Sequence, residues 1–177
     1  MTTEKYAISS RIIHWLMALL IIFLLGLGFY MEEFLSKEAT NRMEIYNLHK
    51  SFGVIALIFI FVRIINRLFK KAPALPSSMP KFEKIFAHLG HASLYLLMIV
   101  MPLSGYLMSN SFGYPVNLFG IELPKIAETN FELGKIFGEI HGLAAYLIAA
   151  IISLHILAVV KHRFFDKEEN DVLKRMI

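Results

Sequence analysis

The stretch from residue 140 to residue 160, IHGLAAYLIAAIISLHILAVV, contains no Asp, Glu, Lys or Arg and carries two histidines, His141 and His155. As an α-helix it would extend about 31 Å, which is enough to cross the roughly 30 Å hydrocarbon core of a bilayer. A histidine inside a membrane is energetically costly and usually marks a functional site. The stretch therefore predicts a transmembrane helix that carries such a site.

The rest of the chain is also rich in apolar stretches. Of its 177 residues, 56% are hydrophobic and only 18% are charged, which is more apolar surface than a soluble domain of this size needs. Residues 12–31 and 85–109 lack charged side chains, and residues 46–66 form a further span if Lys50 and Arg63 extend towards opposite interfaces. We expect one all-α domain over residues 1–177, an integral membrane four-helix bundle. Its expected helices cover about 11–31, 46–66, 85–109 and 138–161.

Charges in the connections predict the orientation of this bundle. Residues 67–84 carry five basic side chains against one acid, whereas residues 32–48 and 110–139 each carry four Glu against two basic residues. By the positive-inside rule the basic connection is cytoplasmic, and four spans then place both termini in the cytoplasm. The net charge of +4 follows from this orientation, so we infer no nucleic-acid partner. The absence of cysteine excludes thiolate metal ligands and Cys-attached haem.

Four histidines fall into two pairs at matched depths. His14 begins the first span and His155 ends the fourth, so both lie near the cytoplasmic face; His49 and His141 begin the second and fourth spans near the outer face. His141 and His155 are almost four helical turns apart, which places them on one helix face with a spacing of roughly 21 Å. Two depth-matched imidazole pairs suit the iron atoms of two haems, each held by two axial histidines. Gly53, one turn after His49, leaves room for a flat macrocycle.

Other interpretations of the histidines stay open. The four could instead form hydrogen bonds between helices; zinc is less suited, because no carboxylate or thiolate accompanies the pairs. His88 and His91 could replace an inner ligand, serve near a quinone or a haem propionate, or lie at a wet interface. His162, two turns after His155, could act near the inner haem or belong to a basic membrane anchor. Lys50 is a candidate propionate partner at the outer face.

Several short motifs follow one another in a specific order along the whole chain. They are residues 11–16 (RIIHWL), 49–53 (HKSFG), 91–95 (HASLY), 102–105 (PLSG), His141, His155, 162–165 (HRFF) and 173–176 (LKRM). In this order and spacing the chain resembles the bacterial cytochrome b561 family. That family comprises small four-helix dihaem proteins related to the cytochrome b subunits of nickel–iron hydrogenases.

The resemblance implies two haems b in a bacterial inner membrane protein. Helices 1 and 4 would hold one haem and helices 2 and 4 the other, which agrees with the pairing expected from topology. It also implies electron exchange with a quinone, and one version of the activity is a superoxide:ubiquinone oxidoreductase. His162 then matches a histidine near the inner haem and a quinone site. His162 and His91 together predict that ubiquinone or menaquinone binds at the cytoplasmic ends of helices 3 and 4.

The charge of the outer connections affects which substrates can approach the outer face. They hold eight Glu against four basic residues, and this field disfavours the approach of the superoxide anion. We therefore expect general quinone-linked electron transfer first and superoxide oxidation as a specific version of it. The alternative is a haem-carrying membrane anchor that conducts electrons for a separate redox protein. In that case residues 110–139 would form the docking surface.

The predicted orientation can be tested by labelling, because single cysteines can be added to a chain that has none. A membrane-impermeant thiol reagent applied to intact cells should label Ser36→Cys and should fail to label Ser77→Cys. The reverse pattern would invert the topology and exchange the compartments that the two histidine pairs face.

Overall fold

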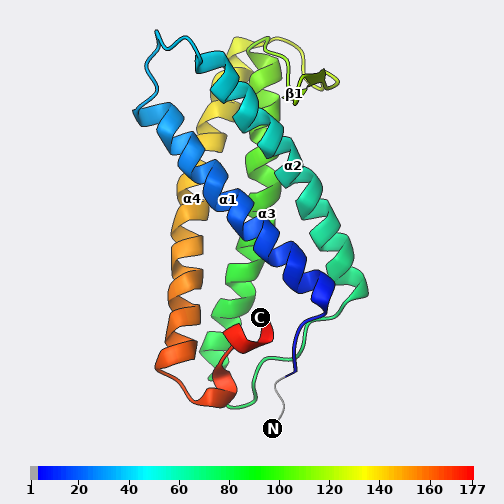
Figure 1. Ribbon diagram of the computed structural model, residues 1–177, viewed down its shortest axis with the longest axis vertical. Coiled ribbons are helices and arrows are strands. Elements are labelled where there is room, and N and C mark those ends of the chain that lie inside the picture. The colour runs from blue at the N-terminus through cyan, green and yellow to red at the C-terminus, as the bar shows by residue number, and fades with distance from the viewer. Residues whose placement is uncertain (1–3) are drawn as a thin grey trace.

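The computed structural model describes residues 4–177 and consists mainly of four long helices (Figure 1). They are α1 (Ile8–Glu33), α2 (Arg42–Phe69), α3 (Lys81–Ser111) and α4 (Phe131–Phe164). In this part of the chain, all four have the length and apolar composition needed to cross a membrane. The predicted all-α four-helix membrane architecture is confirmed. Each helix extends beyond its expected span because its polar ends continue past the apolar segment.

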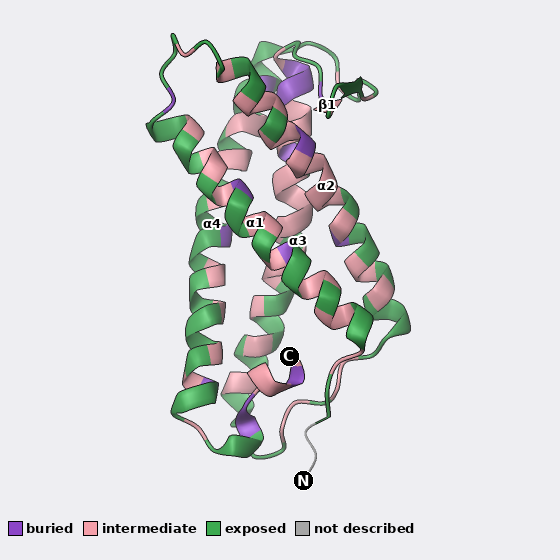
Figure 2. Cartoon of the chain, viewed as in Figure 1, coloured by how far each residue is buried: buried purple, intermediate pink, exposed green. Residues whose placement is uncertain are grey.

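The apolar side chains of these helices point outwards. In the most apolar window of each helix only 6–11% of the residues are buried, and side chains such as Leu19 and Leu154 are about two-thirds exposed, at 67% and 65%. Figure 2 shows these exposed residues along the outer faces of the helices. In water, apolar surface of this extent would cause aggregation. It is suited to contact with lipid, so the bilayer is the natural partner of the fold.

The helices associate as two closely packed pairs. α3 packs along α4 and α1 packs along α2, while α2 also contacts α3. Among the described elements, neither α1 nor α2 packs its backbone closely against α4. Met17 from α1, Ile60 from α2 and Ile148 from α4 are buried within the bundle. The two helix pairs are therefore held apart on the α4 side.

A small hairpin covers the N-terminal end of α2. Its strands are β1 (Asn117–Leu118) and β2 (Ile121–Glu122), paired antiparallel. The two turn residues Phe119 and Gly120 have φ values of +48° and +92°, as a tight two-residue hairpin turn requires. The Ser51 hydroxyl accepts a hydrogen bond from the Phe119 amide at 3.0 Å and lies 2.9 Å from the Asn117 carbonyl. Ser51 thus fixes the hairpin to α2 two residues after His49.

The C-terminal residues fold back under the bundle. Two short 3₁₀ helices, η1 (Glu168–Asn170) and η2 (Leu173–Arg175), follow α4 and lie beneath the other helices (Figure 1). The Arg175 side chain is buried and donates hydrogen bonds to two backbone carbonyls, at 2.8 and 3.3 Å. The Trp15 indole donates to the Met176 carbonyl at 2.9 Å. The end of the chain therefore closes the bundle beside the first turns of α1.

Candidate functional site

Four histidines on three helices face one another in two pairs. The ring centroids of His14 on α1 and His155 on α4 are 6.4 Å apart, and those of His49 on α2 and His141 on α4 are 6.2 Å apart. These are the pairs that the topology predicted. Each pair lies between α4 and a helix whose backbone does not pack closely against it.

The spacing of the rings fits a metal ion between them. A metal–imidazole bond is about 2 Å long, and a ring nitrogen lies roughly 1 Å from its ring centre, so two imidazoles on opposite sides of one metal have centres about 6 Å apart. Both pairs match this separation. In the described part of the chain, no hydrogen bond joins the two rings of either pair, so hydrogen bonding between the rings does not account for the pairing.

The outer pair shows how one ligand is oriented. His141 Nδ1 lies 2.8 Å from the Met101 carbonyl. A carbonyl can only accept, so Nδ1 carries the proton and Nε2 is free to bind a metal. A Cβ atom at Gly105 would lie 2.9 Å from His141 Cε1, so the ring occupies this position only because residue 105 has no side chain. His49 Nδ1 is buried and has no partner among the described residues.

A cavity of about 1090 Å³ lies beside the outer pair. Its lining includes His49, His141 and Gly53, and the cations Lys50 and Arg42 also contribute. Cofactor pockets in proteins usually measure about 300–1,000 Å³, so this space suits a group as large as a haem. Nothing projects from Gly53 into it. The residues present therefore fit a haem, and the two cations would be available to its anionic propionates.

Lys50 itself has a partner that sequence reasoning did not foresee. Its Nζ donates to the Pro115 carbonyl at 2.8 Å and lies 5.8 Å from the centre of the Tyr114 ring. The ammonium thus fastens the outer connection to α2. It lines the cavity and helps to close it at the same time.

The inner pair is surrounded by different groups. An Arg63 guanidinium nitrogen lies 3.0 Å from His14 Nδ1, and Arg63 Nε donates to the Tyr95 hydroxyl at 3.2 Å. His91 on α3 also lies beside His155, with a centroid distance of 5.5 Å. This is shorter than the separation expected across one metal ion, so His14 suits a metal shared with His155 better than His91 does.

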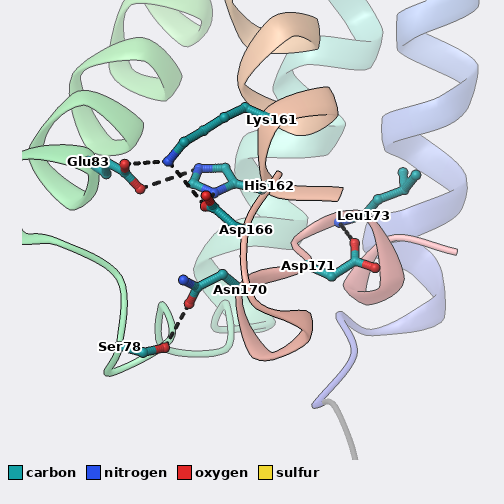
Figure 3. A network of polar contacts seen from close by, with 8 residues as sticks. All are labelled: Ser78, Glu83, Lys161, His162, Asp166, Asn170, Asp171 and Leu173. Atoms are coloured by element: carbon teal, nitrogen blue, oxygen red, sulfur yellow. Dashed lines mark hydrogen bonds and ion pairs between the residues drawn. The ribbon is translucent and has the colours of Figure 1, made fainter. Parts of the chain in front are cut away.

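The remaining two histidines have contrasting environments. His88 is exposed on α3, whereas His162 is buried in a polar cluster at the C-terminal end of α4 (Figure 3). His162 Nδ1 lies 2.6 Å from Asp166 Oδ2, and Lys161 forms ion pairs with both Asp166 and Glu83. Sequence reasoning missed the two carboxylates. The i,i+4 spacing of His162 and Asp166 was the available signal for one of them.

Asp166 determines which nitrogen of His162 carries a proton. Burial alone would raise the pKa of Asp166, but hydrogen bonds from His162 and Lys161 hold it below its ordinary value of 3.8. The carboxylate is therefore ionised at neutral pH and can only accept, so His162 Nδ1 donates to it. His162 Nε2 faces the other acid, 3.9 Å from Glu83 Oε2.

Comparison with known proteins agrees with this geometry. Residues 5–177 match the family model described as prokaryotic cytochrome b561. The chain belongs to the prokaryotic cytochrome b561 family. It is 32% identical over 178 residues to the Escherichia coli K12 protein named cytochrome b561 homolog 2, covering 99% of this chain and 93% of that protein. It is 29% identical over 174 residues to the Yersinia pestis protein named probable superoxide oxidase CybB, covering 98% and 96%.

Membership defines the general class of this cytochrome b561 protein. It is a multi-pass bacterial membrane protein that binds haem b and takes part in electron transfer. Because the family match extends over nearly the whole chain, the histidine-bearing helices, the hairpin and the C-terminal segment all lie within it.

The contact between Gly105 and His141 can be tested directly. Gly105→Ala would place a methyl group 2.9 Å from the imidazole and force the ring out of position, so the purified protein should hold clearly less haem b than the wild type. Gly26→Ala is the matched control, because a Cβ there meets nothing within 4 Å. Pyridine haemochrome analysis of both variants gives the measurement. Equal haem content in both would show that the ring can adjust at no cost.

Proposed function

We propose that this protein carries electrons across the bacterial inner membrane through two haems b and exchanges them with a quinone at the cytoplasmic face. The observation that supports this most is the presence of two imidazole pairs, with centroid separations of 6.4 and 6.2 Å, at opposite ends of the bundle. His14 and His155 would hold the inner haem, and His49 and His141 the outer one. When bound, haem b supplies one-electron exchange between ferric and ferrous iron.

The chain's own residues orient and insulate the two sites. The Met101 carbonyl fixes the His141 ring, and the glycines at 53 and 105 leave space beside it. The hairpin and the Lys50 contact cover the outer end, while the C-terminal segment closes the inner end. The cytoplasmic position of both termini and of the connection between α2 and α3 is part of the proposal, from the bias of positive charge.

Superoxide is the second candidate substrate, at the outer face. The name of the Yersinia pestis relative refers to superoxide oxidation, and Arg42 and Lys50 line the outer cavity where an anion would arrive. Glu32 and Glu33 line the same cavity and oppose that attraction.

The alternative is a conduit that serves a separate redox protein. Superoxide-dependent haem reduction by the purified protein alone favours the enzyme, whereas a requirement for a co-purifying subunit favours the conduit.

The ligand assignment predicts the result of single substitutions. Wild-type protein should hold two low-spin haems b; His141→Ala should remove the outer haem and His14→Ala the inner one, because each iron loses an axial ligand. Reduced-minus-oxidised spectra with pyridine haemochrome quantification measure both. His88→Ala, at an exposed histidine, should retain two haems. Two six-coordinate haems in either ligand variant would contradict the assignment.

The quinone site is expected at the cytoplasmic ends of α3 and α4, near His91 and His162. Quinone reduction consumes protons, and an imidazole nitrogen can hold and release a proton. His91→Ala or His162→Ala protein that retains both haems should exchange electrons with a quinone analogue about tenfold more slowly, with His88→Ala as the control. Stopped-flow haem oxidation gives the rates. Normal rates in both variants would move the quinone to another part of the molecule.

A further inference from the structure

The two imidazole pairs differ in the group that lies next to Nδ1 of one histidine in each pair. At the outer pair, His141 Nδ1 donates to a neutral carbonyl. At the inner pair, His14 Nδ1 meets the Arg63 guanidinium at 3.0 Å. A carbonyl only accepts and a guanidinium only donates, so His141 has a hydrogen-bond acceptor beside its Nδ1, whereas His14 has a fixed positive charge there.

Arg63 is an uncompensated charge in this position. Within the described residues, no carboxylate lies within 4.0 Å of its nitrogens, whereas the cations Lys161 and Arg163 at the same end of the bundle each form an ion pair. The Tyr95 side chain holds the guanidinium from the other side, through its hydroxyl at 3.2 Å and its ring at 5.6 Å. A positive charge is therefore built in beside His14.

The outer site has no comparable charge excess. Arg42 and Lys50 line its cavity, but so do Glu32 and Glu33. The Lys50 ammonium is bonded to the Pro115 carbonyl, and the Arg42 guanidinium donates to the Tyr46 hydroxyl at 3.0 Å. The cations and acids around the outer cavity balance one another.

We propose that Arg63 sets the reduction potential of the inner haem above that of the outer haem, so that electrons run from the outer face to the cytoplasmic face. This rests on the two-haem function proposed above. A ferric haem carries one more positive charge than a ferrous haem, so a neighbouring guanidinium, which is always charged, favours the ferrous form. The effect is strong because charges interact more strongly in the low-dielectric interior than in water. In the resulting step one electron leaves the outer site and enters the inner site, with no bond made or broken.

The environment of His141 favours the ferric form of iron instead of the ferrous form. A carbonyl that accepts the Nδ1 proton makes the ring a more basic ligand, and this favours ferric iron. At His14 the guanidinium gives no such support. When His14 binds through Nε2, its Nδ1 carries the proton and Arg63 cannot donate to it, but the two contacts with Tyr95 keep the charge beside the ring.

Redox titration of the purified protein tests this inference. Arg63→Gln should lower the inner midpoint potential by about 59 mV or more, which is a tenfold change in the ferric-to-ferrous ratio for one electron. Arg63→Lys keeps the charge and should stay close to wild type. Arg67→Gln is the matched control, because it removes a cation one turn later on α2, where the side chain lies over Tyr6. Repeating the titration in a His141→Ala background isolates the inner haem.

The possible outcomes separate the proposed role of Arg63 from the proposed two-haem function. Unchanged potentials in an Arg63→Gln protein that holds both haems would overturn the role of Arg63 and leave the dihaem function intact. A wild-type protein with fewer than two haems would overturn the function itself. If Arg63→Gln loses the inner haem, Tyr95→Phe becomes the test, because it retains the charge but removes one of its anchors. In Tyr95→Phe protein, a downward shift of the inner midpoint potential, smaller than the shift expected for Arg63→Gln, supports the inference. An unchanged inner potential contradicts it.

Discussion

The separation of α4 from the α1–α2 pair is the constraint on which the rest of the structure depends. Helices in a bilayer gain no hydrophobic stabilisation from packing on one another, so close packing and polar contacts must hold them together. α4 packs along α3 but not closely along α1 or α2, and its two histidines face theirs across that space. A ligand that binds only the folded state stabilises it by mass action. On the proposed function, haem b is therefore a structural element of the bundle as well as its redox centre.

The two ends of the bundle are closed by different kinds of contact. At the outer end, hydrogen bonds to uncharged groups make the closing contacts: the Met101 carbonyl orients His141, and the Ser51 hydroxyl fixes the hairpin. At the inner end, the cluster around His162 joins α3, α4 and the segment after α4 through ion pairs. The segment after α4 supplies Asp166 to this cluster. At the inner site the Arg63 guanidinium has no carboxylate partner among the described residues, whereas the cations and acids that line the outer cavity balance one another.

The bundle architecture and the facing histidines could be predicted from sequence because both follow from local patterns. Uncharged runs define the helices, and the depth of a histidine follows from its place in a run. Contacts that depend on helix rotation could not be predicted. His14 and Arg63 lie 49 residues apart and meet only because α1 packs along α2 in one particular rotation. The hydrogen bond from Trp15 to Met176 spans 161 residues and carries no periodic signal. The haem ligands themselves stay a prediction.

Arg63 connects the orientation of the protein with its proposed chemistry. An arginine at the centre of a transmembrane helix costs about 2.5–3.5 kcal/mol on insertion scales, and the cost falls where the side chain can reach the interface. Positive charges at one end of the helices set the topology, and the five basic residues of the connection 67–84 would be enough for that purpose. Arg63 instead turns inwards to His14 and Tyr95. A charge that turns into the bundle, with no carboxylate partner among residues 4–177, is better explained by its effect on the neighbouring site than by membrane orientation alone.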